Sequence, residues 1–184
     1  MNRAFGVTIR AMSIIVLLGT IAFFARNHIF PSASADSSLP HVELNADKIG
    51  PRSIEDRTSQ VVPRDYAYAW QTLAEALASN QSDLLDGYFT GWAKENFSNL
   101  IATQKRTSVH IHYVDHGHKL TALFYAPAGD VMQLRDQAQI ERQVFDGDKL
   151  IDDEPLTVDY MILMTPGADR WLVRDLEATS EVGR

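Results

Sequence analysis

The chain has 184 residues and no cysteine, which excludes a disulfide framework, a lipid-modified cysteine anchor and a Cys-ligated metal site. All 24 acidic residues lie at or after Asp36, whereas three of the 17 basic residues, Arg3, Arg10 and Arg26, precede it, so residues 36–184 carry a net charge of about −10. This charge opposes binding to nucleic acid, and we expect no nucleic-acid partner.

The first element is an apolar segment at the N-terminus. No charged residue occurs from Ala11 to Ala25, and Arg10 and Arg26 flank this run. If Arg10 extends its side chain toward the headgroups, the apolar stretch covers residues 4–25, which is long enough to cross a bilayer with some tilt. We therefore expect residues 1–26 to be a membrane anchor or signal segment, with the membrane itself as a partner.

The positive charge at the N-terminus predicts a single-pass membrane protein whose folded domain lies outside the cytoplasm. The alternative is a cleaved secretory signal, since Ala33-Ser34-Ala35 has the small-residue form of a cleavage site. Cleavage following Ala35 would leave a secreted or periplasmic protein.

Residues 27–62 are predicted to be a flexible linker, because prolines and a Ser/Ala cluster interrupt any apolar period. Within it, residues 41–44 could form a short strand. A folded domain is expected over residues 63–178, followed by a disordered tail over 179–184.

Two helices open the folded domain. The first is predicted over Pro63–Ser79, because proline suits the first helical position and a single apolar stripe follows it. That stripe consists of Tyr66, Trp70, Leu73 and Leu77. The second helix is predicted over Asp83–Lys105, with a kink or a close helix contact at Gly87 and Gly91.

From Thr107 onward the apolar period changes to two, which is typical of strands. The expected strands are residues 107–114, 120–125, 131–145, 157–164 and 171–176. Asp146-Gly147 is expected to be a hairpin turn, and residues 152–155 are expected to interrupt the sheet. The strand over 131–145 is so long that it must bend, bulge or wrap.

This order predicts an α+β fold: an N-terminal membrane helix, a linker, and two helices packed on a strongly bent antiparallel β-sheet. The two helices contain residues 74–89, Ala-Glu-Ala-Leu-Ala-Ser-Asn-Gln-Ser-Asp-Leu-Leu-Asp-Gly-Tyr-Phe, and such a sheet follows them. On these features the chain resembles the nuclear-transport-factor-two-like or ketosteroid-isomerase-like cone over residues 63–178. The resemblance implies a concave sheet with a pocket at its mouth. Members of that superfamily include enzymes, binding modules and scaffolds, so the fold does not settle the function.

Four of the six histidines fall within nine residues, at His110, His112, His116 and His118. On a strand His110 and His112 share a face, and a turn at residues 115–117 could bring His118 back to them. These three are candidate ligands for Zn, Ni or Cu, and His110 and His112 are also candidate catalytic groups. Alternatively, the histidines are solvated side chains at an edge strand, or they form hydrogen bonds within a pocket.

Asp136 and Arg142 fall on the otherwise apolar face of the strand over 131–145. A carboxylate buried in a cone pocket has a raised pKa and can act as a general base, as the resemblance to the isomerases implies. Alternatively, a bulge puts both residues in solvent, or they form a structural ion pair.

Several aromatic side chains at helical or strand spacing could line a cavity, although such residues are more often core. The candidates for ligand binding are Tyr88, Trp92 and Tyr160. No phosphate loop, dinucleotide fingerprint or nucleophile elbow occurs, so no cofactor is expected.

The sequence thus favours a membrane-tethered extracytoplasmic domain without enzymatic activity that binds a protein partner or a small apolar ligand. The alternative is a small cofactor-free enzyme, of isomerase or hydrolase type, with a pocket between helices and sheet. An enclosed pocket that contains Asp136 and a histidine would favour the enzyme. A filled core with an exposed apolar patch would favour the binding module.

Overall fold

The computed structural model describes residues 39–183, which belong to one of the chain's two units, Ala35–Arg184. The predicted anchor over residues 4–25 and the cleavage site after Ala35 lie outside the described residues. Of the helices within residues 39–183, none is long and apolar enough to cross a membrane.

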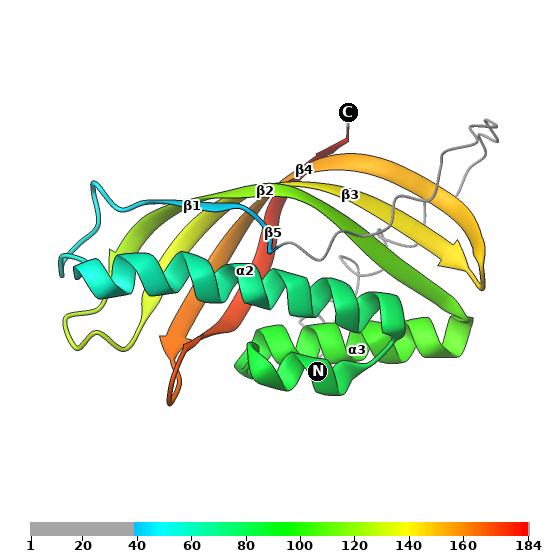
Figure 1. Ribbon diagram of the computed structural model, residues 1–184, viewed down its shortest axis with the longest axis horizontal. Coiled ribbons are helices and arrows are strands. Elements are labelled where there is room, and N and C mark those ends of the chain that lie inside the picture. The colour runs from blue at the N-terminus through cyan, green and yellow to red at the C-terminus, as the bar shows by residue number, and fades with distance from the viewer. Residues whose placement is uncertain (1–38, 184) are drawn as a thin grey trace, which may run out of the picture. The chain divides into compact units, whose positions relative to one another are not determined.

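The described residues form an α+β fold in which two helices pack on one five-stranded sheet, as the sequence predicts (Figure 1). The helical elements are α2 (Asp56–Ser79), the 3-10 helix η1 (Ser82–Gly87) and α3 (Gly91–Thr107). The strands are β1 (Val42–Asn45), β2 (Val109–Tyr125), β3 (Met132–Asp146), β4 (Lys149–Pro166) and β5 (Trp171–Gly183).

The sheet has the order β1-β2-β3-β4-β5. The pairs from β2 to β5 are antiparallel, which confirms the predicted meander, and the hairpin at Asp146-Gly147 joins β3 to β4. β1 pairs in parallel with β2, from Val42 opposite His118 to Asn45 opposite Thr121. The short strand suggested at residues 41–44 is therefore present, and it ties part of the expected linker to the sheet.

β2 is one continuous strand, so the predicted turn at residues 115–117 is wrong. The register between β2 and β3 shifts between Asp115 and Gly117, which leaves His116 as an extra residue. Gly117 has a φ of 129°, and its N–H donates to Asp115 Oδ1 at 2.8 Å. A glycine beside polar residues therefore forms a β-bulge here, and the chain continues in the same direction.

β4 and β5 are both longer than the sequence predicts. β4 runs through residues 152–155, so the predicted interruption there is wrong, and β3 supplies the pairing partners as far as Lys149. β5 continues past Leu176 to Gly183, where a tail was expected, and pairs with β4 from Leu156 onward.

The first helix begins at Asp56, so Pro63 lies inside it rather than at its first position. An interior proline costs a helix about 3 kcal/mol. Starting earlier places Val62 on the same face as Tyr66, and both side chains are fully buried. Since each such burial contributes about 1.5–3 kcal/mol, tertiary packing outweighs the local cost.

The predicted second helix is divided into two parts. Between η1 and α3, Thr90 N–H donates to the Val173 carbonyl at 2.9 Å, and Val173 N–H donates to the Tyr88 carbonyl at 2.8 Å. The break falls between Gly87 and Gly91, as expected, but it is a short piece of strand pairing with β5 rather than a kink.

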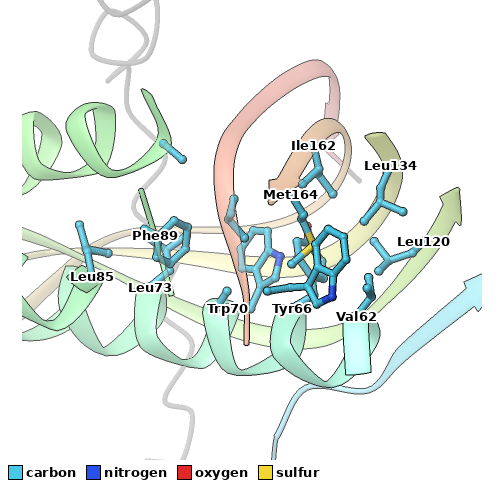
Figure 2. Close-up of a cluster of buried hydrophobic side chains, with 14 of the residues drawn as sticks. Val62, Tyr66, Trp70, Leu73, Leu85, Phe89, Leu120, Leu134, Ile162 and Met164 are labelled. Carbon is cyan, nitrogen blue, oxygen red and sulfur yellow. The ribbon is translucent and has the colours of Figure 1, made fainter. Parts of the chain in front are cut away.

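The core lies between the inner face of the sheet and the helices. In Figure 2, Val62, Tyr66, Trp70 and Leu73 from α2 face Leu120, Leu134, Ile162 and Met164 from the sheet. Phe89 and Leu85 extend the same cluster toward α3. The core between these layers is therefore packed with large side chains.

Replacing Gly91 with alanine should lower the free energy of unfolding by about 1–2 kcal/mol. Gly91 has a φ of +53°, and an added Cβ would lie 3.1 Å from Arg174 Cγ and 3.2 Å from the Arg174 carbonyl oxygen. Urea unfolding would measure the loss. Gly87→Ala is the matched control, because a Cβ there meets no atom within 4 Å, and an equal loss in both variants would contradict the argument.

Candidate functional site

Three elements bring a polar cluster together inside the core, formed by His118 on β2, Asp136 on β3 and Tyr66 on α2. His118 Nδ1 lies 2.6 Å from Asp136 Oδ2, and the Tyr66 hydroxyl donates to the same oxygen at 2.9 Å. On the other side of the ring, His118 Nε2 lies 2.6 Å from Asp115 Oδ2. One imidazole therefore bridges two carboxylates.

The positions of these groups follow from the fold. Leu120 of β2 is opposite Asp136, and His118 is opposite Ala138, so the two polar residues occupy neighbouring places on the inner face. The bulge at His116 lets Asp115, three residues before His118, reach the same ring. Tyr66 comes from the apolar stripe of α2.

The electrostatics of the cluster favour a charged imidazolium. Burial alone lowers the pKa of His118, but the hydrogen bonds and charges of Asp115 and Asp136 outweigh burial and raise the pKa from 6.5 to about 9. At neutral pH both ring nitrogens then carry protons and donate to the two carboxylates. Burial and the neighbouring Asp136 raise the pKa of Tyr66 well above its usual value, so its hydroxyl remains a donor.

The cluster is closed off from solvent. The exposed fraction is 1% for His118 and 0% for Asp136 and Tyr66, and the Trp70 ring lies 4.6 Å from the His118 ring. Asp136 Oδ1 and Trp70 Nε1 are also buried, and neither forms a hydrogen bond with the described part of the chain. Asp115, the second carboxylate on the His118 ring, has 19% of its side chain exposed.

A shallow hollow of about 120 Å³ lies near the same strands but on the other face of the sheet. Its lining includes Gln137 and Gln139, which alternate with the inward-facing Asp136 and Ala138 along β3, and it also includes His118. The hollow therefore borders the strand that carries His118, but the side chain of His118 is 0% exposed. It is not the enclosed pocket that the enzyme alternative requires.

The prediction that Asp136 belongs to the apolar face is confirmed. The pairing of β3 with β4 continues without a shift from Met132 to Val144, so the bulge that would have moved Asp136 into solvent is absent from this stretch. Arg142 forms ion pairs instead, with its Nη2 2.7 Å from Glu154 Oε2. Neither residue pairs with the other.

The remaining histidines lie apart from this cluster along β2. His110 stacks on Phe145 with ring centroids 5.0 Å apart, and His112 Nδ1 lies 3.3 Å from Gln143 Oε1. Because the strand does not turn back, it does not bring His118 to them as the metal hypothesis required. Within residues 39–183 no three His, Cys, Asp or Glu side chains gather as a metal site would need.

The three aromatic ligand candidates do not share a cavity. Trp92 is 63% exposed at the start of α3. Tyr88 stacks on Tyr68 with ring centroids 5.6 Å apart, and the Arg170 guanidinium lies over its ring. Tyr160 packs edge-on against Trp70 within the core.

Two members of the cluster were missed as polar partners. The sequence pattern places Tyr66 on the apolar stripe of a helix, among aromatic residues that could line a cavity, and Asp115 in a turn, and it predicts no hydrogen bond from either to His118 or Asp136. The available signal was the presence of His118 among the alternating apolar residues that lead to Leu120 and Ala122. Continued as one strand, that alternation places His118 on the same inner face as Asp136.

No protein family model matches the chain, and no curated protein matches its sequence. Among solved structures, it is similar to the intermembrane space region of the chloroplast protein ARC6, with a TM-score of 0.59 and 10% sequence identity. The match covers 70% of this chain and 98% of that chain. At this identity the likeness concerns the fold alone, and it supports the α+β architecture; the cone-superfamily assignment stays a prediction.

Proposed function

We propose that this protein is a membrane-tethered domain outside the cytoplasm that binds a protein partner. The observation that carries the proposal is the distribution of side chains. The groups capable of acid–base chemistry, His118 and Asp136, are sealed in a packed core, whereas large apolar side chains such as Trp92 stand in solvent. Recognition by surface contact fits this distribution better than catalysis does.

The tether and the location rest on the sequence of residues 1–26, with their apolar run and flanking arginines. One solved structure of similar fold is the intermembrane space region of the chloroplast protein ARC6. That setting is compatible with a domain held outside the cytoplasm. The sealed cluster is then a structural element that fixes α2 against β2 and β3.

Crosslinking in native membranes tests this function. The full-length chain should capture a specific protein, and a chain lacking residues 1–35 should lose it, because the tether holds the domain beside its partner. Mass spectrometry of the crosslinked products would identify the captured protein. If neither chain captured a specific protein, the proposal would fail and the enzyme alternative would gain support.

A further inference from the structure

The first half of β4 is an unpaired edge of the sheet. β5 pairs with β4 only from Leu156 onward, so Lys149–Pro155 has β3 on one side and no strand of residues 39–183 on the other. Figure 1 shows this length of β4 on the outside of the curved sheet. Apart from Pro155, which has no N–H, the backbone N–H and C=O groups along such an edge are available to another extended chain.

The same edge carries exposed apolar side chains. Leu150 is 44% exposed and Ile151 is 43% exposed. The pairing register shifts between Val144 and Phe145, which leaves Ile151 as the extra residue of a bulge. Natural proteins usually keep large apolar side chains off the exposed edge of a sheet. Two exposed aliphatic residues at this edge therefore indicate that another chain covers it.

The edge is also strongly acidic. Arg142 is shared among three carboxylates, with N–O distances of 2.7 Å to Glu154, 3.8 Å to Asp152 and 3.5 Å to Glu181. Asp153 is exposed on the opposite face of the strand. Partial burial raises the pKa of its carboxyl, and the charge of the neighbouring Glu141 adds to the rise.

We propose that residues 149–155, the β4 edge, bind an extended segment of the partner that alternates basic and apolar residues and adds as a further strand. This inference rests on the proposed function, since it names the surface that meets the partner. Main-chain hydrogen bonds would supply affinity, and basic side chains on the face that carries Asp152 and Glu154 would select the sequence.

A second copy of the chain fits this edge poorly. If two β4 edges paired antiparallel about Asp152, that residue would face its own copy, and Ile151 would face Asp153. Like charges directly opposite each other across strands are destabilising. In this register charge therefore favours a basic partner over self-pairing.

The test uses the full chain in lipid nanodiscs and a fluorescent peptide of alternating lysine and valine. We expect the peptide to bind and to slow amide hydrogen exchange in residues 149–155. The double variant D152K/E154K should weaken binding by about tenfold, because it replaces two attractive charges on one face of the strand with repulsive ones. No binding at millimolar peptide, or binding without protection of these amides, would overturn the inference.

The matched control is D47K/E95K, which makes the same change in net charge at two exposed acidic residues on β1's flank and on α3. This variant should change binding by less than about twofold. Equal weakening in both double variants would mean that the peptide responds only to overall charge, and would overturn the inference. Dimers that the peptide dissociates in sedimentation would assign the edge to a second copy, and would overturn it as well.

A photo-crosslinking residue at Ile151, compared with one at Glu95, separates this inference from the proposed function. Capture of a membrane partner at Ile151 that the lysine–valine peptide blocks supports both. Capture at Glu95 alone would support the proposed function but overturn the inference that the β4 edge binds the partner. Capture at neither position overturns both.

Discussion

Replacing Asp136 with alanine should lower the free energy of unfolding by about 3–5 kcal/mol, the usual loss when one partner of a buried ion pair is removed. The Asp136 carboxylate is fully buried and accepts from both His118 and Tyr66. Without it, the imidazolium keeps only Asp115, and the Tyr66 hydroxyl loses its acceptor. Since domains of this size are stable by about 5–15 kcal/mol, the variant should lose a large fraction of its stability.

Urea unfolding of the full chain in mild detergent, followed by tryptophan fluorescence, would measure this loss, because Trp70 lies against His118. Gln137→Ala is the matched control: it is the next residue on the same strand but faces solvent, so its cost should stay within about 0.5 kcal/mol. Asp136→Asn keeps the shape of the side chain and should fall between the two. A loss for Asp136→Ala no larger than that for Gln137→Ala would contradict the structural role.

The inward position of Asp136 could be predicted because strand periodicity is strict. Each residue along β3 changes face, and the neighbours Leu134 and Ala138 are both fully buried. The partners of Asp136 could not be predicted in the same way. His118 and Tyr66 are distant from Asp136 in sequence. Only the register between β2 and β3 and the packing of α2 on the sheet bring these residues to Asp136.

The error at residues 115–117 has a simple physical cause. Aspartate and glycine among polar residues favour a turn and also favour a β-bulge, since both need a glycine-like backbone. Pairing with β3 continues on both sides of this point, and pairing with β1 begins at His118, so β2 remains one strand. That information lies in residues 41–45 and 132–146 and not in the local sequence.

At Pro63 and at residues 152–155, too, the local sequence does not predict the structure. A proline and a run of acidic residues are local signals against helix and strand, respectively. Burial of Val62 and Tyr66 on one face of α2 overrides the first signal, and the long ladder between β3 and β4 overrides the second. Element type was thus predictable wherever an apolar period was sustained, while element ends depended on tertiary packing.

The stability of the folded domain should fall as the pH rises from about 6.5 to about 9. The pKa of His118 is about 9 in the folded state against 6.5 for the free side chain. Because the folded pKa is the higher one, the contribution of this group is complete below about pH 6.5 and is lost as the pH rises through about 9. A shift of this size corresponds to a loss on the order of 3 kcal/mol.

Urea unfolding at a series of pH values would follow this loss, and NMR titration of the imidazole signals would assign it to a residue independently of folding energy. His116→Gln provides the control, because His116 is exposed on the same bulge and its removal leaves the Asp115–His118–Asp136 contacts in place. That variant should keep the wild-type dependence of stability on pH. A His118 signal that titrates near pH 6.5, together with stability that is flat from pH 6.5 to 9, would show that the two carboxylates do not hold the proton. Above pH 6.5 His118 would then be a neutral imidazole that donates to one carboxylate alone, rather than an imidazolium that bridges Asp115 and Asp136.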